Sequence, residues 1–123
     1  MEEELYTLLV SLLGSYKVYP SILPIDADYP CARYLLVYDD FEQTKDPTLS
    51  GLARFQLDIY SRDSIGGQSA FKIVADLQET VKSGLNGHSG TTIREIRVQN
   101  VTRDYEEEIE AHISRIEFNV YHT

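Results

Sequence analysis

The sequence of 123 residues has one cysteine, no tryptophan and no long run of apolar residues. Its single cysteine, Cys31, excludes an intramolecular disulfide and is typical of proteins from a reducing interior. Cys31 has no basic neighbour in the sequence that would lower its thiol pKa, which favours a buried structural role over a nucleophile. No apolar stretch approaches the roughly 18–20 residues of a membrane-spanning helix. Because the chain begins MEEELYTLLVSLLG, acidic rather than basic, we expect no secretory signal and predict assembly in a cytoplasm.

Basic residues are also scarce. Eleven Lys and Arg stand against 20 Asp and Glu, which gives a net charge of −9 and a pI near 4.6. Binding to a phosphate backbone depends on a positive surface, so this composition argues against a DNA- or RNA-binding protein. The simplest interpretation of the acidic excess is solubility.

Side-chain sets that support catalysis or bind metal are missing as well. His88, His112 and His122 do not have the spacing of metal ligands. The acidic residues between 39 and 46 lack the alternation and the central glycine of a calcium loop. The pair Gly66–Gly67 lacks the lysine and the further glycines of a phosphate-binding loop. The sequence therefore predicts no catalytic residue, no cofactor site and no metal site.

What is present is organised around one strand and one helix. In residues 52–61, LARFQLDIYS, apolar and polar side chains alternate, which predicts a strand with one buried face. Residues 65–85 follow as a helix after a turn at Gly66–Gly67. Its apolar stripe has helical spacing, and Gly84 is predicted to take the left-handed C-terminal cap. The stripe consists of Phe71, Val74, Leu77, Val81 and Leu85.

The remaining segments supply a second helix and the rest of a sheet. Leucines at helical spacing predict a helix over residues 2–13. Residues 16–32 are interrupted by prolines, and we expect an irregular crossing with Val18, Ile22 and Ile25 turned inward. Residues 33–38 are apolar on both faces, which is typical of a central strand that helices or a neighbouring subunit cover on both sides.

The C-terminal third predicts two strands. Residues 92–101 have an irregular apolar phase, so a bend or bulge is expected there. In the last strand the apolar positions change parity, which predicts a β-bulge near Ser114–Arg115. The whole chain is thus predicted to be one α+β domain, residues 1–123. It contains a mostly antiparallel, four- or five-stranded sheet with two helices packed chiefly on one face.

Two surfaces are candidates for interaction. Arg54, Gln56 and Asp58 form the polar face of the strand 52–61. They either make cross-strand pairs in solvent or meet another subunit. The long polar segment 39–51 between two antiparallel strands is the other candidate, because loops of this length are often functional. Within it and in the turn 86–91, the candidate contact residues are Asp40, Phe41, Glu42, Lys45, Leu49 and His88.

The segment RFQLDIYSRDSIGGQSAFKIVADLQETV resembles the tail-terminator (tail-completion) proteins of long-tailed bacteriophages. The resemblance extends to CARYLLVYDD and HISRIEFNVYH. It implies a structural virion protein whose subunits form a ring, usually a hexamer, that caps the tail tube and stops its elongation. The implied partners are other copies of the chain, the major tail tube protein and the head–tail connector protein.

The same resemblance implies a position at the head-proximal end of the tail, after assembly in the bacterial cytoplasm. Double-stranded DNA would pass through the lumen without specific binding, which suits an acidic protein. Three alternatives stay open from the sequence. They are a neck or head-completion protein, a small ligand-binding regulatory domain that forms a dimer and, for want of reacting groups, least of all an enzyme.

Overall fold

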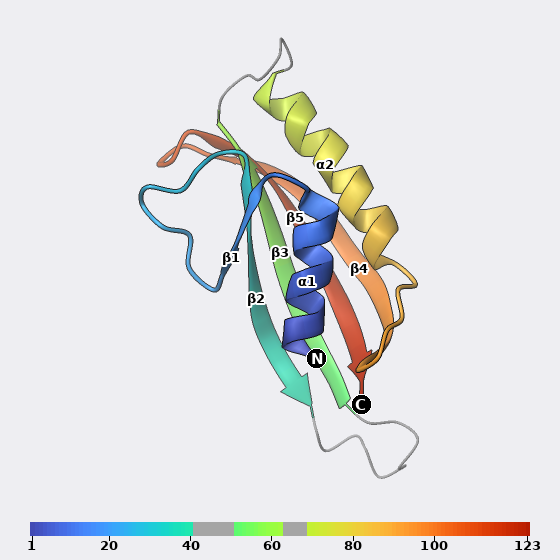
Figure 1. Ribbon diagram of the computed structural model, residues 1–123. Coiled ribbons are helices and arrows are strands. Elements are labelled where there is room, and N and C mark those ends of the chain that lie inside the picture. Colours follow the sequence, from blue (N-terminus) through green and yellow to red (C-terminus); the bar gives the residue numbers. More distant parts are fainter. Residues whose placement is uncertain (41–50, 63–68) are drawn as a thin grey trace.

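The computed structural model describes residues 1–40, 51–62 and 69–123 and contains two helices and five strands (Figure 1). The elements, in chain order, are α1 (Glu2–Leu13), β1 (Lys17–Pro20), β2 (Cys31–Asp40), β3 (Gly51–Ser61), α2 (Ala70–Leu85), β4 (Ile93–Glu106) and β5 (Ala111–His122).

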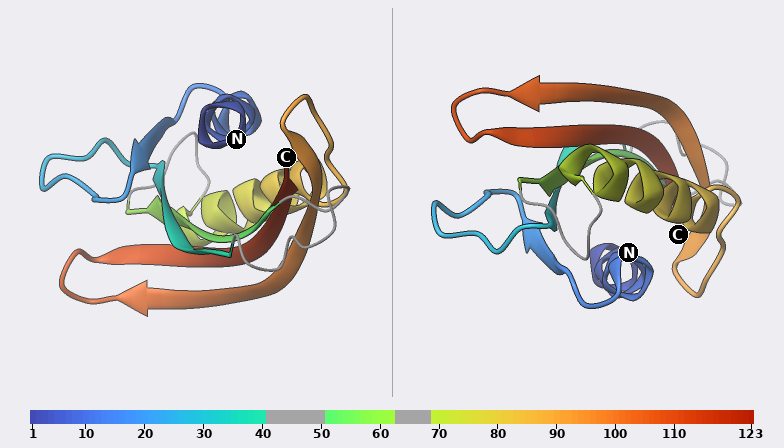
Figure 2. Two further views of the ribbon diagram at one scale, coloured as in Figure 1. Left: turned by 90° about the horizontal axis from the view of Figure 1, so that it is seen from below. Right: turned by 90° about the horizontal axis from the view of Figure 1, so that it is seen from above.

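The strands form one sheet in the order β1-β2-β3-β5-β4. Among these five described strands, only β1 and β2 run parallel, and the other neighbours are antiparallel. Both helices lie on the same side of this sheet (Figure 2). The predicted α+β class, with a mostly antiparallel sheet and two helices on one face, is confirmed.

The core lies between the helices and the sheet. Ala53, Phe55, Leu57 and Ile59 of β3 are fully buried, as their alternation predicts. Phe55 stacks on Phe118 of β5 with 6.0 Å between the ring centroids. From the helices come Leu5, Leu9 and Leu13 of α1, and Val74, Val81 and Leu85 of α2. Each such leucine contributes about 1.5–3 kcal/mol by its burial, so α1 is held by the sheet rather than by its own helix propensity.

The prediction for residues 16–32 is only partly right. Val18 is buried, but Ile22 and Ile25 are exposed by 76% and 104%. The apolar positions of the β1–β2 connection that pack inward are instead Leu23, Ala27 and Tyr29. Because Lys17–Pro20 is a strand, it carries Val18 into the core and leaves Ile22 and Ile25 on the outer side of the connection.

Two details of α2 also differ from expectation. Gly84 lies inside the helix, where a Cβ would overlap Leu12 of α1, and the left-handed conformation falls on Gly87 (φ 84°). Gly84 therefore serves the close approach of two helices rather than a cap. Phe71, predicted to be buried, is 52% exposed, and its stripe is completed by Ile73. The predicted turn at Gly66–Gly67 lies outside the described residues.

The predicted bulge near Ser114–Arg115 is wrong, since β5 pairs with β3 in an unbroken register from Gly51↔His122 to Ser61↔His112. The change of parity has another cause: Ala111 and Ile113 are buried on the helix-free face by the β1–β2 connection. The irregularity expected in the strand before it is confirmed, with register shifts in β4 at Ile93/Glu95 and Val98/Asn100.

The second face of β2 is less covered than predicted. β1 pairs only with Cys31–Tyr34, so the rest of β2 is at the margin of the sheet (Figure 1). There Leu36, Val37 and Tyr38 are exposed by 42%, 50% and 46%. A register shift falls between Leu36 and Tyr38.

Candidate interaction surface

The helix-free face of the sheet holds a charged cluster centred on Asp58 of β3. Its carboxylate is fully buried and accepts hydrogen bonds from Arg33 Nη2 at 2.6 Å and from Arg115 Nε at 2.9 Å. Gln56 Nε2 donates to both carboxylate oxygens, and the Tyr60 hydroxyl lies 3.4 Å from Oδ2. Three neighbouring strands supply these groups, because β2 and β5 place Arg33 and Arg115 directly opposite Asp58. We refer to these five residues as the Asp58 cluster.

Arg54 continues this polar face toward the other end of β3. Its Nε donates to Asn119 Oδ1 at 2.9 Å, and its Nη1 lies 3.8 Å from Glu117 Oε2. The structure thus brings Arg54, Gln56 and Asp58 onto one face, as predicted. The row is less exposed than a solvated face would be, since Arg54 and Gln56 are half-buried and Asp58 is fully buried.

The electrostatics of the cluster follow from its geometry. The hydrogen bond to Asp58 is the main cause that raises the pKa of Arg115. Burial, helped by the nearby Asp58 charge, raises the pKa of Tyr60 to about 12. Both groups keep their protons at neutral pH, and an arginine that is already paired offers little attraction to a further anion.

Arg33 and Arg115 were not among the residues selected from the sequence. Each is a single basic residue in an apolar strand, and only the strand register shows that both face Asp58. The strand itself indicates that a partner exists, because an aspartate between Leu57 and Ile59 in a buried strand requires one.

Beside the cluster lies a small apolar patch, formed by Cys31, Tyr60, Ala111 and Ile113. Burial raises the pKa of the Cys31 thiol to about 12, so it stays protonated. The predicted structural role of this cysteine agrees with its complete burial.

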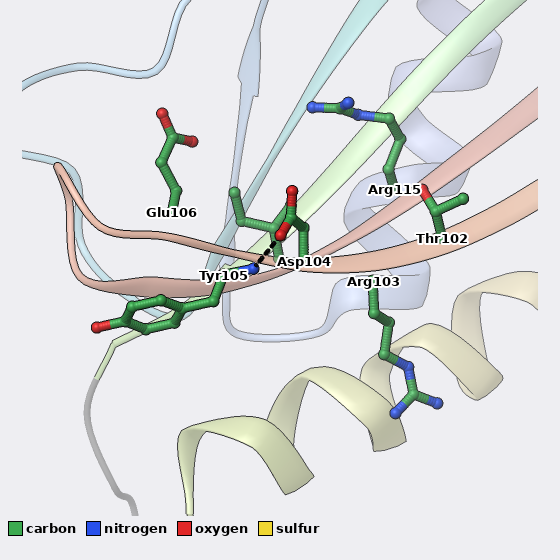
Figure 3. Close-up of a pocket in the computed structure, with 7 residues that line it drawn as sticks. Thr102, Arg103, Asp104, Tyr105, Glu106 and Arg115 are labelled. Atoms are coloured by element: carbon green, nitrogen blue, oxygen red, sulfur yellow. Dashed lines mark hydrogen bonds between the residues drawn. The ribbon is translucent and has the colours of Figure 1, made fainter.

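A pocket of about 200 Å³ opens next to this patch, at the end of β4 and the start of β5 (Figure 3). Arg115 points away from α2, whereas Arg103 reaches toward it (Figure 3). Asp104 Oδ1 accepts a hydrogen bond from the backbone N–H of Tyr105 at 2.7 Å. The pocket is below the roughly 300–1,000 Å³ of small-molecule sites, and mostly charged and polar residues line it, so it gives the ligand-binding alternative little support.

The described ends of the segment 39–51 and the turn 86–91 lie at the same end of the molecule. His122 Nε2 lies 3.1 Å from Asp39 Oδ1, next to Asp40, and a Cβ on Gly51 would overlap the His122 ring. One residue further, the Thr123 N–H donates to Thr92 O at 2.9 Å, at the end of the α2–β4 turn.

Of the predicted contact residues themselves, His88 lies in that turn and accepts a hydrogen bond from the Ile96 N–H at its backbone carbonyl. The backbone of Asp40 ends β2. Phe41, Glu42, Lys45 and Leu49 lie outside the described residues.

Across residues 1–40, 51–62 and 69–123, no three His, Cys, Asp or Glu side chains are grouped so that they could hold a metal ion. Neither of the two described helices is long and apolar enough to cross a membrane.

The fold is similar to that of a chain in a solved virion structure. The chain superposes on a chain of the solved structure "Virion of native gene transfer agent (GTA) particle" with a TM-score of 0.59 and 17% sequence identity. The match covers 93% of this chain and 83% of that one. No protein-family model and no curated protein sequence matches the chain.

Proposed function

We propose that this chain is a structural protein of a phage-like virion, and within the virion the tail terminator. Copies of the chain form a ring on the last layer of the tail tube, stop its elongation and present a surface to the head–tail connector protein. The observation that carries the proposal is the likeness in fold, over nearly the whole chain, to a chain of a gene transfer agent virion. The mechanism is differential binding without covalent chemistry.

The arrangement of the sheet supports this role. The end of β2, the start of β3 and the α2–β4 turn lie at one end of the molecule, so one ring surface can contact a partner through all three. The opposite end carries the β4–β5 turn and the β1–β2 connection (Figure 1). A ring built from such subunits has two chemically different faces, which a protein needs if it binds the tube on one side and a connector on the other.

The test is tail length after deletion of the gene from the phage, prophage or gene transfer agent that carries it. Negative-stain electron microscopy is expected to show overlong tails of variable length, because the tube has lost its stop. A plasmid copy of the unchanged gene should restore the length. Normal-length tails detached from filled heads would contradict the terminator role and indicate a neck protein. Intact particles of normal length would contradict any role in assembly.

A further inference from the structure

At each of the two edges of the sheet, a stretch of backbone has no strand beside it among the described residues. On one side, β1 ends at Pro20, opposite Tyr34, so the outer backbone groups of residues 35–40 have no described strand beside them. We call this stretch the β2 edge. On the other side, the α2–β4 turn covers the first half of β4: Gly87 and His88 exchange hydrogen bonds with Ile96.

The turn also holds Val98, whose N–H donates to Asn86 Oδ1 at 3.1 Å. Beyond this point, residues 99–106 run along the margin without such a cover from the described part of the chain, and we call them the β4 edge. Unpaired rows of N–H and C=O groups are templates for another strand. The two edges lie at diagonally opposite corners of the sheet.

We propose that the β2 edge of one copy pairs with the β4 edge of the next, so that the sheet continues from subunit to subunit. This inference rests on the proposed ring and names its interface. The strand directions agree with it, because three antiparallel steps separate β2 from β4 and the two run in opposite directions. A rotation about an axis tilted from the strands, which continues the sheet from copy to copy, therefore sets the two edges antiparallel, and this is the more stable pairing.

The side chains of the two edges match as well. Leu36 pairs with Phe55 and so lies on the helix-bearing face, and Tyr105 pairs with His112 on that same face. Both are large and apolar, and both are exposed, by 42% and 47%. Continuing the sheet would bring them onto one surface, where they can bury each other.

The diagonal placement of the two edges determines how neighbouring copies are offset. Pairing half of one edge with half of the other shifts each copy along the strand direction relative to its neighbour. Closing a sheet into a ring requires this kind of stagger together with tilted strands. Pairing of two β2 edges about a twofold axis would instead give a dimer and leave both β4 edges open.

Cross-linking of the purified chain tests the interface directly. Val37→Cys and Thr102→Cys, alone and combined in a Cys31→Ala background, would be treated with a short bismaleimide that tolerates differences in register. The combined variant is expected to give a ladder of cross-linked oligomers, whereas neither single variant does. Dimers from Val37→Cys alone would overturn the proposal in favour of twofold pairing. The absence of any cross-link at high protein concentration would also overturn it.

Charge placed on the β2 edge gives an independent readout. Val37→Lys is expected to shift the oligomer to the mass of a monomer in light scattering, with an unchanged far-ultraviolet circular dichroism spectrum. Ile25→Lys, at a more exposed apolar position on the β1–β2 connection, is the matched control and should leave the mass unchanged. An oligomer of unchanged mass in Val37→Lys would overturn the pairing.

The same variants separate this inference from the proposed function. If deletion of the gene gives overlong tails and a gene copy carrying Val37→Lys restores the normal length fully, the terminator role stands and the interface is wrong. If deletion leaves tail length unchanged, the role is wrong, and cross-linking still decides whether the edges pair.

Discussion

Gln78 of α2 accepts a hydrogen bond from the buried hydroxyl of Ser114 at 2.8 Å, across the boundary between helix and sheet. The same Oε1 accepts from Arg103 Nε at 2.9 Å. Gln78 is 6% exposed and stands where an apolar residue would otherwise complete the stripe of α2. Because a hydrogen bond is directional, it fixes the rotation of α2 about its own axis more closely than apolar packing alone does.

Gln78→Ala is expected to lower the free energy of unfolding by about 1–3 kcal/mol, because the Ser114 hydroxyl remains buried without an acceptor. Urea denaturation measures this change. Gln99→Ala is the control, since Gln99 is exposed and bonds only to Arg97 O at 3.4 Å among the described contacts. Equal effects of the two substitutions would contradict a structural role of the buried amide.

Asp58→Ala is expected to destabilise the fold by about 2–3 kcal/mol. This is below the roughly 3–5 kcal/mol of a fully buried pair, because the Arg115 side chain keeps 44% of its exposure and can be hydrated after the loss. Asp76→Ala removes the exposed pair with Lys72 and should change stability by less than about 0.5 kcal/mol. Guanidinium or thermal unfolding would compare the two. A loss for Asp58→Ala as small as that for Asp76→Ala would show that the cluster contributes no more than a surface ion pair.

Glu4 makes stability depend on pH. Its Oε2 accepts hydrogen bonds from the Thr92 N–H at 2.8 Å and from the Thr92 hydroxyl at 2.7 Å, which lower its pKa. A lowered folded-state pKa contributes stability that is present above the unfolded pKa, ordinarily 4.5 for a glutamate, and that is lost as the pH falls through the folded value.

The stability difference between the unchanged protein and Glu4→Gln should therefore be full at pH 7 and shrink steadily below the ordinary glutamate pKa of 4.5. Urea midpoints across this range measure it. Glu3→Gln, at the exposed neighbouring position, serves as the control for the loss of one surface charge. A Glu4→Gln difference that stays constant down to strongly acidic pH would contradict the role of the Glu4 carboxylate as an acceptor for Thr92.

Gly84→Ala should behave differently in two backgrounds. Alone it forces Leu12 to move, because a Cβ would overlap the Leu12 methyl groups, and it should not give the usual gain of helix propensity. With Leu12→Ala already present, the space is open and the same substitution should stabilise by about 0.5–1 kcal/mol. A double-mutant cycle measures the coupling, and additive effects would contradict the close helix contact.

Cys31 should resist thiol reagents in the folded protein. Burial raises its pKa to about 12, so almost no thiolate exists at mildly alkaline pH, and the sulfur is inaccessible. Absorbance after addition of an aromatic disulfide reagent should rise only at the rate of unfolding. Ile25→Cys with Cys31→Ala provides an exposed thiol that reacts at once, and an equally fast reaction of Cys31 would contradict its burial.

The sequence predicted those elements in which periodicity and burial agree. The helix 2–13 and the strand 52–61 match because their apolar positions face one core. The expected bulge at Ser114–Arg115 failed because strand β5 is buried on opposite faces in its two halves, and parity alone does not distinguish this from a bulge. The prediction that Ile22 and Ile25 turn inward is wrong, because apolar character does not reveal which side of a connection faces the core.

The candidate surface was predictable only in part. Arg54, Gln56 and Asp58 share a face by alternation, which the sequence shows. Their partners come from strands that are distant in the chain, and the pairing of Arg33 and Arg115 with one carboxylate depends on a register that a single sequence does not specify.

The strand order has a consequence for the route by which this chain folds. β5 inserts between β3 and β4, so the pairing of Arg54 with Asn119 joins residues more than half the chain apart. The β4–β5 hairpin can form from neighbouring residues, but the central pairing must wait until residues 111–122 are available. Until then β3, whose Ala53, Phe55, Leu57 and Ile59 belong to the core, is without one of its two neighbours. During synthesis the chain therefore carries an exposed strand until residues 111–122 have been made, and chaperone binding at β3 would protect it through that interval.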